Sequence, residues 1–168
     1  MDVEKELEKG RSALSENKNF TKRLKKKKPK DLDVQVQDLH DEVFDTVDCL
    51  SCANCCKTTS PGMHDKDVDR LAKHLRMKSV DLIAQHMKMD NDGDYVFREA
   101  PCPFLGSDNY CSVYEARPLA CREYPHTNRK RFYQVLDLTV KNTEVCPATI
   151  KVLEGLKKVY AQKKPPRS

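Results

Sequence analysis

Four cysteines fall within eight residues in the stretch Cys49-Leu50-Ser51-Cys52-Ala53-Asn54-Cys55-Cys56, a Cys-x2-Cys-x2-Cys-Cys pattern. A Cys-x2-Cys turn lets two thiolates converge on one centre. Backbone N–H groups of the turn then hydrogen-bond the sulfur atoms, which favours the thiolate and metal binding. The stretch therefore predicts a cysteine-ligated metal site around which the chain folds.

Four more cysteines follow singly, at Cys102, Cys111, Cys121 and Cys146. Cys102 and Cys146 are each followed by proline. Three cysteines spaced like Cys49, Cys52 and Cys55 resemble the ligand run of a bacterial ferredoxin, whose remote fourth ligand is a Cys-Pro. Either Cys-Pro pair would complete a [4Fe-4S] cluster with these three, and the spacing does not choose between them.

The total of eight cysteines suggests a second four-cysteine centre. Neighbouring side chains such as Cys55 and Cys56 usually point in different directions, so Cys56 suits a separate site. The second four-thiolate site would then contain Cys56, Cys111, Cys121 and the Cys-Pro that the first site does not use. Zinc is the alternative, because a four-cysteine zinc site needs the same thiolates. Zinc sites usually have two separate Cys-x2-Cys pairs, so a single tight cluster favours iron–sulfur over zinc.

The composition limits the size of the core and the type of protein. The chain has 168 residues, of which 38% are hydrophobic and 34% charged, with a mean hydropathy of −0.76. That supports one modest core. No apolar stretch approaches the ~20 residues of a membrane-spanning helix, and the charged residues 1–9 do not form a signal peptide. We therefore expect a cytoplasmic protein without membrane contact, in which clustered cysteines indicate metal or redox chemistry rather than disulfides.

The apolar spacing predicts a mainly α fold with short strands and irregular, turn-rich loops, forming a small single domain organised around cysteine-ligated metal. Helical periodicity predicts helices over 31–47, over 65–77, from Ser79 onward and from Pro147 onward. A short strand is expected at Tyr95–Phe97, and alternating apolar residues predict another over 132–140.

The net charge of +5 is unevenly distributed. Residues 1–30 and 157–168 are strongly basic, and residues 31–156 have more acidic than basic side chains. We predict a partly disordered basic segment over 1–30, a cysteine-cluster metal-binding domain over 31–156 and a basic tail over 157–168. The run Lys25-Lys26-Lys27-Lys28-Pro29-Lys30 suits nucleic acid or an acidic partner. It lacks interleaved aromatic residues, which favours a solubilising role over nucleic-acid binding.

Four motifs in a fixed order resemble one family. They are Cys49–Cys56, then Cys102-Pro103-Phe104-Leu105, then Cys111-Ser112-Val113-Tyr114, then Arg117-Pro118-Leu119-Ala120-Cys121-Arg122-Glu123-Tyr124-Pro125. The chain resembles the YkgJ-type cysteine-cluster (CxxCxxCC) family over about 43–156. That family is described as a putative zinc- or iron-chelating domain and sometimes as iron–sulfur-cluster-containing. The resemblance implies metal chelation by the matched cysteines.

The family motif also places Arg117 and Arg122 beside Cys121. A guanidinium near a thiolate cluster would offset its negative charge and hydrogen-bond sulfur, making both residues candidate cofactor-binding groups. The alternative is that they pair with Glu115 or Glu123 on the surface. Tyr114 and Tyr124 are expected to pack around the site.

The expected function is a metal-binding protein with one or two cysteine-ligated centres, used for electron transfer or metal handling with a protein or redox partner. A similar cysteine domain occurs in bacterial flagellin lysine methylases, so the alternative is an accessory or catalytic part of a protein- or peptide-modifying enzyme. The chain has no room for a conventional methyl-donor-binding domain. Whether it is an enzyme therefore stays open, and no catalytic residue is assigned.

Overall fold

The computed structural model describes residues 2–162 and is mainly helical, which confirms the expected fold class. The chain divides into two compact units. We call Met1–Asp48 with Pro125–Ser168 the helical unit and Cys49–Tyr124 the cysteine-rich unit. The basic residues 163–168 of the predicted tail lie outside the described residues. Among residues 2–162, no helix has the length and apolar character needed to cross a membrane.

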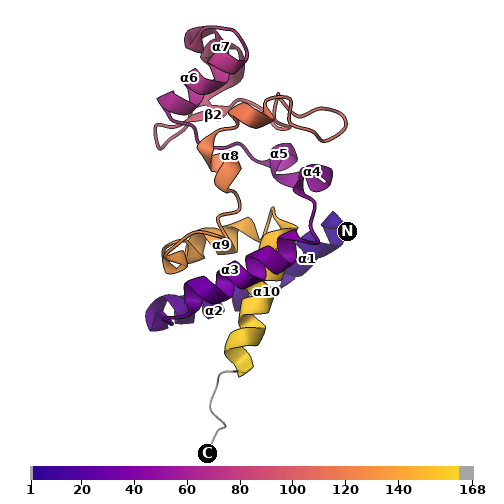
Figure 1. Cartoon of the computed structure of the whole chain (residues 1–168), viewed down its shortest axis with the longest axis vertical. Helices are drawn as coiled ribbons and strands as arrows, with labels where there is room; N and C mark the ends of the chain where they lie inside the picture. The colour runs from indigo at the N-terminus through magenta and orange to yellow at the C-terminus, as the bar shows by residue number, and fades with distance from the viewer. Residues whose placement is uncertain (1, 163–168) are drawn as a thin grey trace, which may run out of the picture. The chain divides into compact units, whose positions relative to one another are not determined.

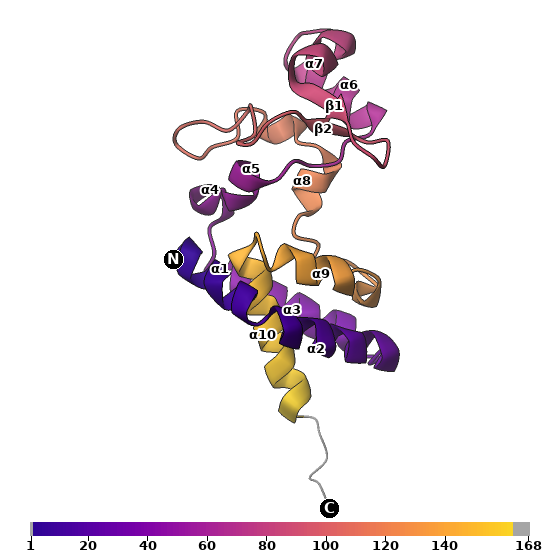
Figure 2. The same cartoon turned by 180° about the vertical axis from the view of Figure 1, so that it is seen from behind.

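Over residues 2–48 and 125–162, the helical unit consists of these helices (Figures 1 and 2): α1 Val3–Ser12, α2 Leu14–Lys27, α3 Leu32–Phe44, the 3-10 helix η2 Phe132–Gln134, α9 Leu136–Asn142 and α10 Pro147–Gln162. Helix α10 packs against α3 and α1, while α2 packs against α9. Helices α3 and α10 approach closely at Gly155, where a Cβ would lie 2.5 Å from a methyl carbon of Leu39 and would displace that side chain. The helices predicted over 31–47 and from Pro147 are confirmed.

Residues 3–27, within the segment expected to be partly disordered, are almost entirely helical. They form α1 and α2, and Leu7, Phe20 and Leu24 are all buried. The apolar residues are too few to hold an isolated helix. Because Phe20 and Leu24 recur four residues apart, however, they form one stripe that covers other helices. Tertiary packing rather than local propensity therefore makes this segment helical.

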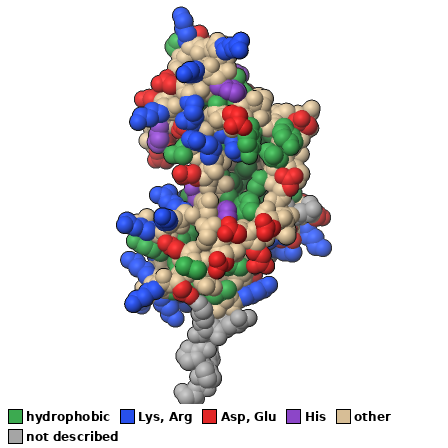
Figure 3. All heavy atoms as spheres, viewed as in Figure 1, with side chains coloured by type: hydrophobic (Ala, Val, Ile, Leu, Met, Phe, Trp, Pro, Cys, Tyr) green, Lys and Arg blue, Asp and Glu red, His purple; other side chains and the backbone are tan. Residues whose placement is uncertain are grey.

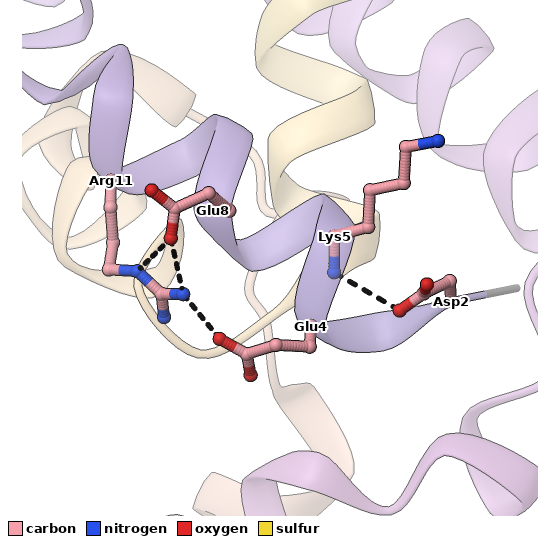
Figure 4. Close-up of polar contacts among 5 residues, drawn as sticks. All are labelled: Asp2, Glu4, Lys5, Glu8 and Arg11. Atoms are coloured by element: carbon pink, nitrogen blue, oxygen red, sulfur yellow. Dashed lines mark hydrogen bonds and ion pairs between the residues drawn. The ribbon is translucent and has the colours of Figure 1, made fainter.

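The start of α1 is held by local polar contacts (Figure 4). The Asp2 carboxylate accepts a hydrogen bond of 3.1 Å from the backbone N–H of Lys5, which caps the helix. Arg11 donates to Glu8 at 2.8 Å and also contacts Glu4. These charges are exposed, so each pair contributes little to stability. Burial of Leu7 is the larger contribution from this helix.

The strand predicted over 132–140 was wrong, because this segment forms η2 and α9. Its buried residues Leu136, Thr139 and Val140 are three or four apart, which is helical spacing. The carboxylate of Asp33 accepts hydrogen bonds from the backbone N–H groups of Arg131 (2.7 Å) and Phe132 (2.9 Å). This carboxylate therefore fixes the turn that opens η2.

The cysteine-rich unit contains short helices and one two-stranded sheet: α4 Cys49–Cys52, α5 Asn54–Thr58, α6 Asp65–His74, α7 Ser79–His86, β1 Met87–Met89, β2 Tyr95–Phe97, η1 Tyr114–Ala116 and α8 Leu119–Glu123. Strands β1 and β2 are antiparallel, with Met87 opposite Phe97. The predicted helices over 65–77 and from Ser79 and the strand at Tyr95–Phe97 are confirmed.

The core of this unit consists of ten buried residues: Met63, Val68, Leu71, Ala72, Leu82, Met87, Phe97, Phe104, Val113 and Ala116. Phe104 lies edge-on to Phe97, with ring centroids 5.6 Å apart. Two cysteines, Cys102 and Cys111, pack against this core. The sheet and the helices α6 and α7 thus form the apolar base that carries the cysteine segments.

Candidate metal centre

The cysteine run folds into α4 and α5, which meet at Ala53. Ala53 has a left-handed backbone conformation, with φ 47°, and is buried. This conformation, rare for a residue with a side chain, breaks the helix between Cys52 and Cys55. The Sγ atoms of Cys55 and Cys56 are 4.0 Å apart.

Residues 102–111 form a loop whose ends are joined by backbone pairing, and Cys102 and Cys111 lie at these ends. The two ends of the loop meet in an antiparallel bridge between Leu105 and Cys111. The backbone N–H of Gly106 donates to the carbonyl of Tyr110 at 2.7 Å, which tightens the turn. At its start, the N–H of Cys102 donates to the carbonyl of Cys56 at 2.8 Å. The loop is thereby fixed beside α5 and its last cysteine.

Backbone N–H groups act on two of these thiols. The N–H groups of Phe104 and Leu105 lower the pKa of Cys102, and that of Val113 lowers the pKa of Cys111, in each case against the larger effect of burial. The N–H of Leu105 also donates to the carbonyl of Cys102 at 3.0 Å. Each of these residues follows its cysteine by two or three positions, as in the turns that surround metal-bound thiolates.

Four thiols in this unit act on one another electrostatically: Cys56, Cys102, Cys111 and Cys121. Burial raises the pKa of Cys102 to about 11, and the charges of Cys56 and Cys111 add to this effect. Burial likewise raises the pKa of Cys121 to about 12, reinforced by the charges of Cys56, Cys102 and Cys111. These thiols come from α5, the 102–111 loop and α8, and they lie within range of one another's charge.

Cys56 differs from the other three. Its hydrogen bond with Cys55 lowers its pKa to about 7 against the opposing effect of burial, and the charges of Arg117 and Lys57 help. It is therefore the thiol of the four that ionises most readily. A cation bound among the four sulfurs would replace the repulsion between thiolates with attraction. In the part of the chain that the structure describes, no three His, Cys, Asp or Glu side chains are arranged to hold an ion.

Arg117 is the positive charge next to these thiols. It lowers the pKa of Cys56, Cys111 and Cys121, after the larger effects of burial and neighbouring groups. Its guanidinium stacks 3.5 Å from the ring centroid of Tyr114, and its Nε donates to the Tyr114 carbonyl at 2.9 Å. These two contacts fix the side chain in place beside the cysteines.

An ion pair on α6, between a buried carboxylate and a half-buried guanidinium, holds the segment that leads to Cys121. The buried Asp67 carboxylate accepts hydrogen bonds from Arg70 at 2.5 Å and from the N–H of Leu119 at 3.0 Å. Arg70 also donates to the carbonyl of Arg117 at 2.8 Å. Sequence reasoning missed this pair. The available signal was an acidic residue next to Val68 on the apolar face of α6, with a basic residue three positions later.

The cysteine segments match a known protein family. The model of the CxxCxxCC family, described as a putative zinc- or iron-chelating domain, matches residues 48–147, a range that contains all eight cysteines. The chain belongs to this family. No curated protein and no solved structure matched the chain. Helices α1, α2 and α3 and most of α10 lie outside the matched range, so the CxxCxxCC domain is here combined with additional helices.

The structure distributes the predicted CxxCxxCC site residues between the two units. Seven cysteines lie in the cysteine-rich unit, while Cys146 is buried in the helical unit directly before α10. Cys49 is exposed, and Cys52 and Cys55 are half-buried. Arg122 is exposed on α8. The assignment of all eight cysteines as metal ligands and their partition between two centres stay predictions.

Proposed function

We propose that Cys56, Cys102, Cys111 and Cys121 bind one metal centre through four thiolate ligands, and that this centre is an iron–sulfur cluster used for electron transfer or metal handling. The observation that supports the proposal is the hydrogen bond of 2.8 Å from the Cys102 N–H to the Cys56 carbonyl, together with the Leu105–Cys111 bridge that closes the loop between Cys102 and Cys111. The charges of Cys56, Cys102 and Cys111 also raise the pKa of Cys121, which agrees with a shared location. The four positions are the second group expected from the sequence, with Cys102 as its Cys-Pro ligand.

The donor set fits soft metal ions. Thiolate sulfur selects zinc, copper(I) and iron–sulfur clusters over magnesium or calcium. Four protein ligands leave no vacant coordination position, unlike a catalytic zinc site with three ligands and a water. This favours a structural or electron-transfer centre over a hydrolytic one.

Two features favour iron–sulfur over zinc. The first is that the four proposed ligands contain no Cys-x2-Cys pair, whereas zinc sites commonly have two. The second is the set of backbone N–H groups that stabilise the charged forms of Cys102 and Cys111, because N–H groups next to ligand sulfur adjust the reduction potential of such clusters. Arg117 would offset the negative charge of the ligated thiolates. Arg122, which follows Cys121 directly, is the weaker candidate for this role because it is exposed.

Anaerobic purification followed by visible absorption and elemental analysis tests the proposed metal. We expect a brown protein with broad absorption near ~400 nm that contains iron and acid-labile sulfide. A colourless protein with stoichiometric zinc would retain the thiolate site but contradict the iron–sulfur assignment. A protein that binds neither metal after reconstitution would contradict both.

A further inference from the structure

The lysine run that the sequence suggested as a solubilising tail is an ordered helical surface. Residues 22–28 form the last part of α2 and its C-cap, and six of these seven residues are Lys or Arg. Leu24 is the buried exception, and the basic side chains are exposed. Burial of Phe20 and Leu24 thus fixes which way these charges face.

A second basic segment lies beside the first in the helical unit. It consists of Arg129, Lys130 and Arg131, all exposed, about 100 positions later in the sequence. Tyr133 follows it in η2, and the ammonium group of Lys28 lies 4.9 Å from the centroid of that ring. Helix α2 also contacts η2 directly. Asp33 anchors the same turn through the N–H of Arg131.

The figures show the same arrangement. In Figures 1 and 2 the end of α2 and the loop before η2 lie side by side in the helical unit. Figure 3 shows Lys and Arg side chains gathered over this end of the unit. We call the basic residues of 22–30 and 129–131 the basic surface.

The charges of the basic surface are nearly uncompensated. Its two segments contain ten basic residues and no acidic one. Among residues 2–162, one of the ten forms an ion pair, Lys25 with Asp137 at 2.6 Å. Like charges held this close repel one another, which disfavours the folded state unless a polyanion neutralises them.

We propose that the basic surface binds the phosphate backbone of nucleic acid without reading its sequence. At a helical rise of about 1.5 Å per residue, six charges over residues 22–28 give about one positive charge per 2 Å of axis. Duplex DNA carries about one negative charge per 1.7 Å. The charge densities are therefore closely complementary.

The composition of the surface supports nucleic acid over an acidic protein. Within its two described segments, no large apolar side chain is exposed. Protein interfaces place apolar and aromatic anchors at their centre and deplete lysine, whereas nucleic-acid interfaces are polar and strongly positive. Tyr133 supplies an aromatic group that the lysine run lacks, and the 129–131 segment adds three basic groups.

Fluorescence anisotropy with the full chain and a fluorescein-labelled 20-base-pair DNA duplex tests the proposal. Two variants remove charge from the two segments separately: K22Q/K26Q and R129Q/K130Q. The matched control K66Q/K73Q removes two exposed lysines from α6 in the other unit. Circular dichroism verifies folding, and metal content is measured on the same samples so that failure of the metal proposal is recognised separately.

Each basic-surface variant should bind the duplex about tenfold or more weakly at 0.1 M salt, with a slope of log affinity against log salt about 2 units shallower. The control should bind like the unmodified chain. Equal losses in control and test variants, or binding too weak to detect at 50 mM salt, would overturn the proposal. Competition by poly-glutamate as strong as that by DNA of equal charge would overturn it in favour of an acidic protein partner.

Discussion

Replacing Asp67 by alanine tests whether the α6 ion pair holds the segment that leads to Cys121. The substitution removes the acceptor for the Leu119 N–H and for Arg70. Breaking a buried ion pair by removing one partner typically destabilises a protein by about 3–5 kcal/mol. The side chain of Arg70 is 35% exposed, so water can partly replace the lost carboxylate. We therefore expect a loss of about 2–3 kcal/mol in the free energy of unfolding.

The assay is urea unfolding followed by circular dichroism, with Asp69→Ala as the matched control. Asp69 lies on the same helix but is exposed, and its carboxylate accepts one hydrogen bond of 2.6 Å from Ser79 Oγ. The control should lose less than about 1 kcal/mol. Hydrogen exchange should show faster exchange of the Leu119 amide in Asp67→Ala only. If the two variants lose the same free energy of unfolding within about 0.5 kcal/mol, and the Leu119 amide exchanges at its original rate in Asp67→Ala, the role assigned to this pair is refuted.

The stabilisation that Asp67 provides should depend on pH. Burial raises the pKa of Asp67, but Arg70 and the N–H groups of Leu119 and His64 more than offset this, so the net pKa is lowered. A carboxylate with a lowered folded-state pKa stabilises the fold above its unfolded value of about 4. This contribution is lost as the pH falls through the folded value. The free energy of unfolding of Asp67→Ala should therefore lie below that of the unmodified chain at pH 7, and the gap should shrink as the pH falls. A gap that stays constant from pH 7 to pH 3 would contradict this.

Three further predictions concern single residues. Phe20→Ala should lower the free energy of unfolding by about 3–4 kcal/mol because Phe20 is buried, whereas the exposed Lys26→Ala should change it by less than 0.5 kcal/mol in the same urea assay. Gly10→Ala should lower the free energy of unfolding by about 1–3 kcal/mol, because the new Cβ would lie 2.5 Å from the carbonyl oxygen of Thr143. This loss is expected although alanine favours helices. An increase in melting temperature would contradict it. In a protein with a reconstituted cluster, Arg117→Gln should lower the reduction potential in protein-film voltammetry, because the reduced state loses a compensating positive charge, and an unchanged potential would remove Arg117 from the site.

Local patterns were sufficient to predict several elements. The apolar spacing predicted α3, α6 and α10, because each buries a stripe of helical period. It also predicted α7, although that helix buries Leu82 and leaves Val80 exposed. Residues 132–140 show where the pattern failed: alternation suggested a strand, while burial of Leu136, Thr139 and Val140 follows the helical period. Similarly, α2 depends on packing against α9, which no local window contains.

The candidate site was predicted in residue type but not in arrangement. Spacing alone suggested that Cys56 belongs with Cys111 and Cys121, but it did not choose between Cys102 and Cys146 as the fourth residue. In the structure, the N–H of Cys102 donates a hydrogen bond to the Cys56 carbonyl, which holds Cys102 beside α5. The charges of Cys56 and Cys111 then affect the pKa of Cys102, and the charge of Cys102 affects that of Cys121. Asp67 and Arg70 were missed because the only signal, an acidic residue on the apolar face of α6 with a basic residue three positions later, does not show which segment the pair holds.

The most direct test of the proposed centre is metal binding by a variant that retains only its four cysteines. The variant C49S/C52S/C55S/C146S leaves Cys56, Cys102, Cys111 and Cys121 in place. After anaerobic reconstitution with iron and sulfide, and separately with zinc, X-ray absorption should show metal coordinated by sulfur, with Zn–S distances near ~2.3 Å in the zinc form. Adding C102S to this variant should abolish binding. A quadruple variant that folds but binds no metal, while the unmodified chain does, would contradict the assignment of these four thiols to one centre.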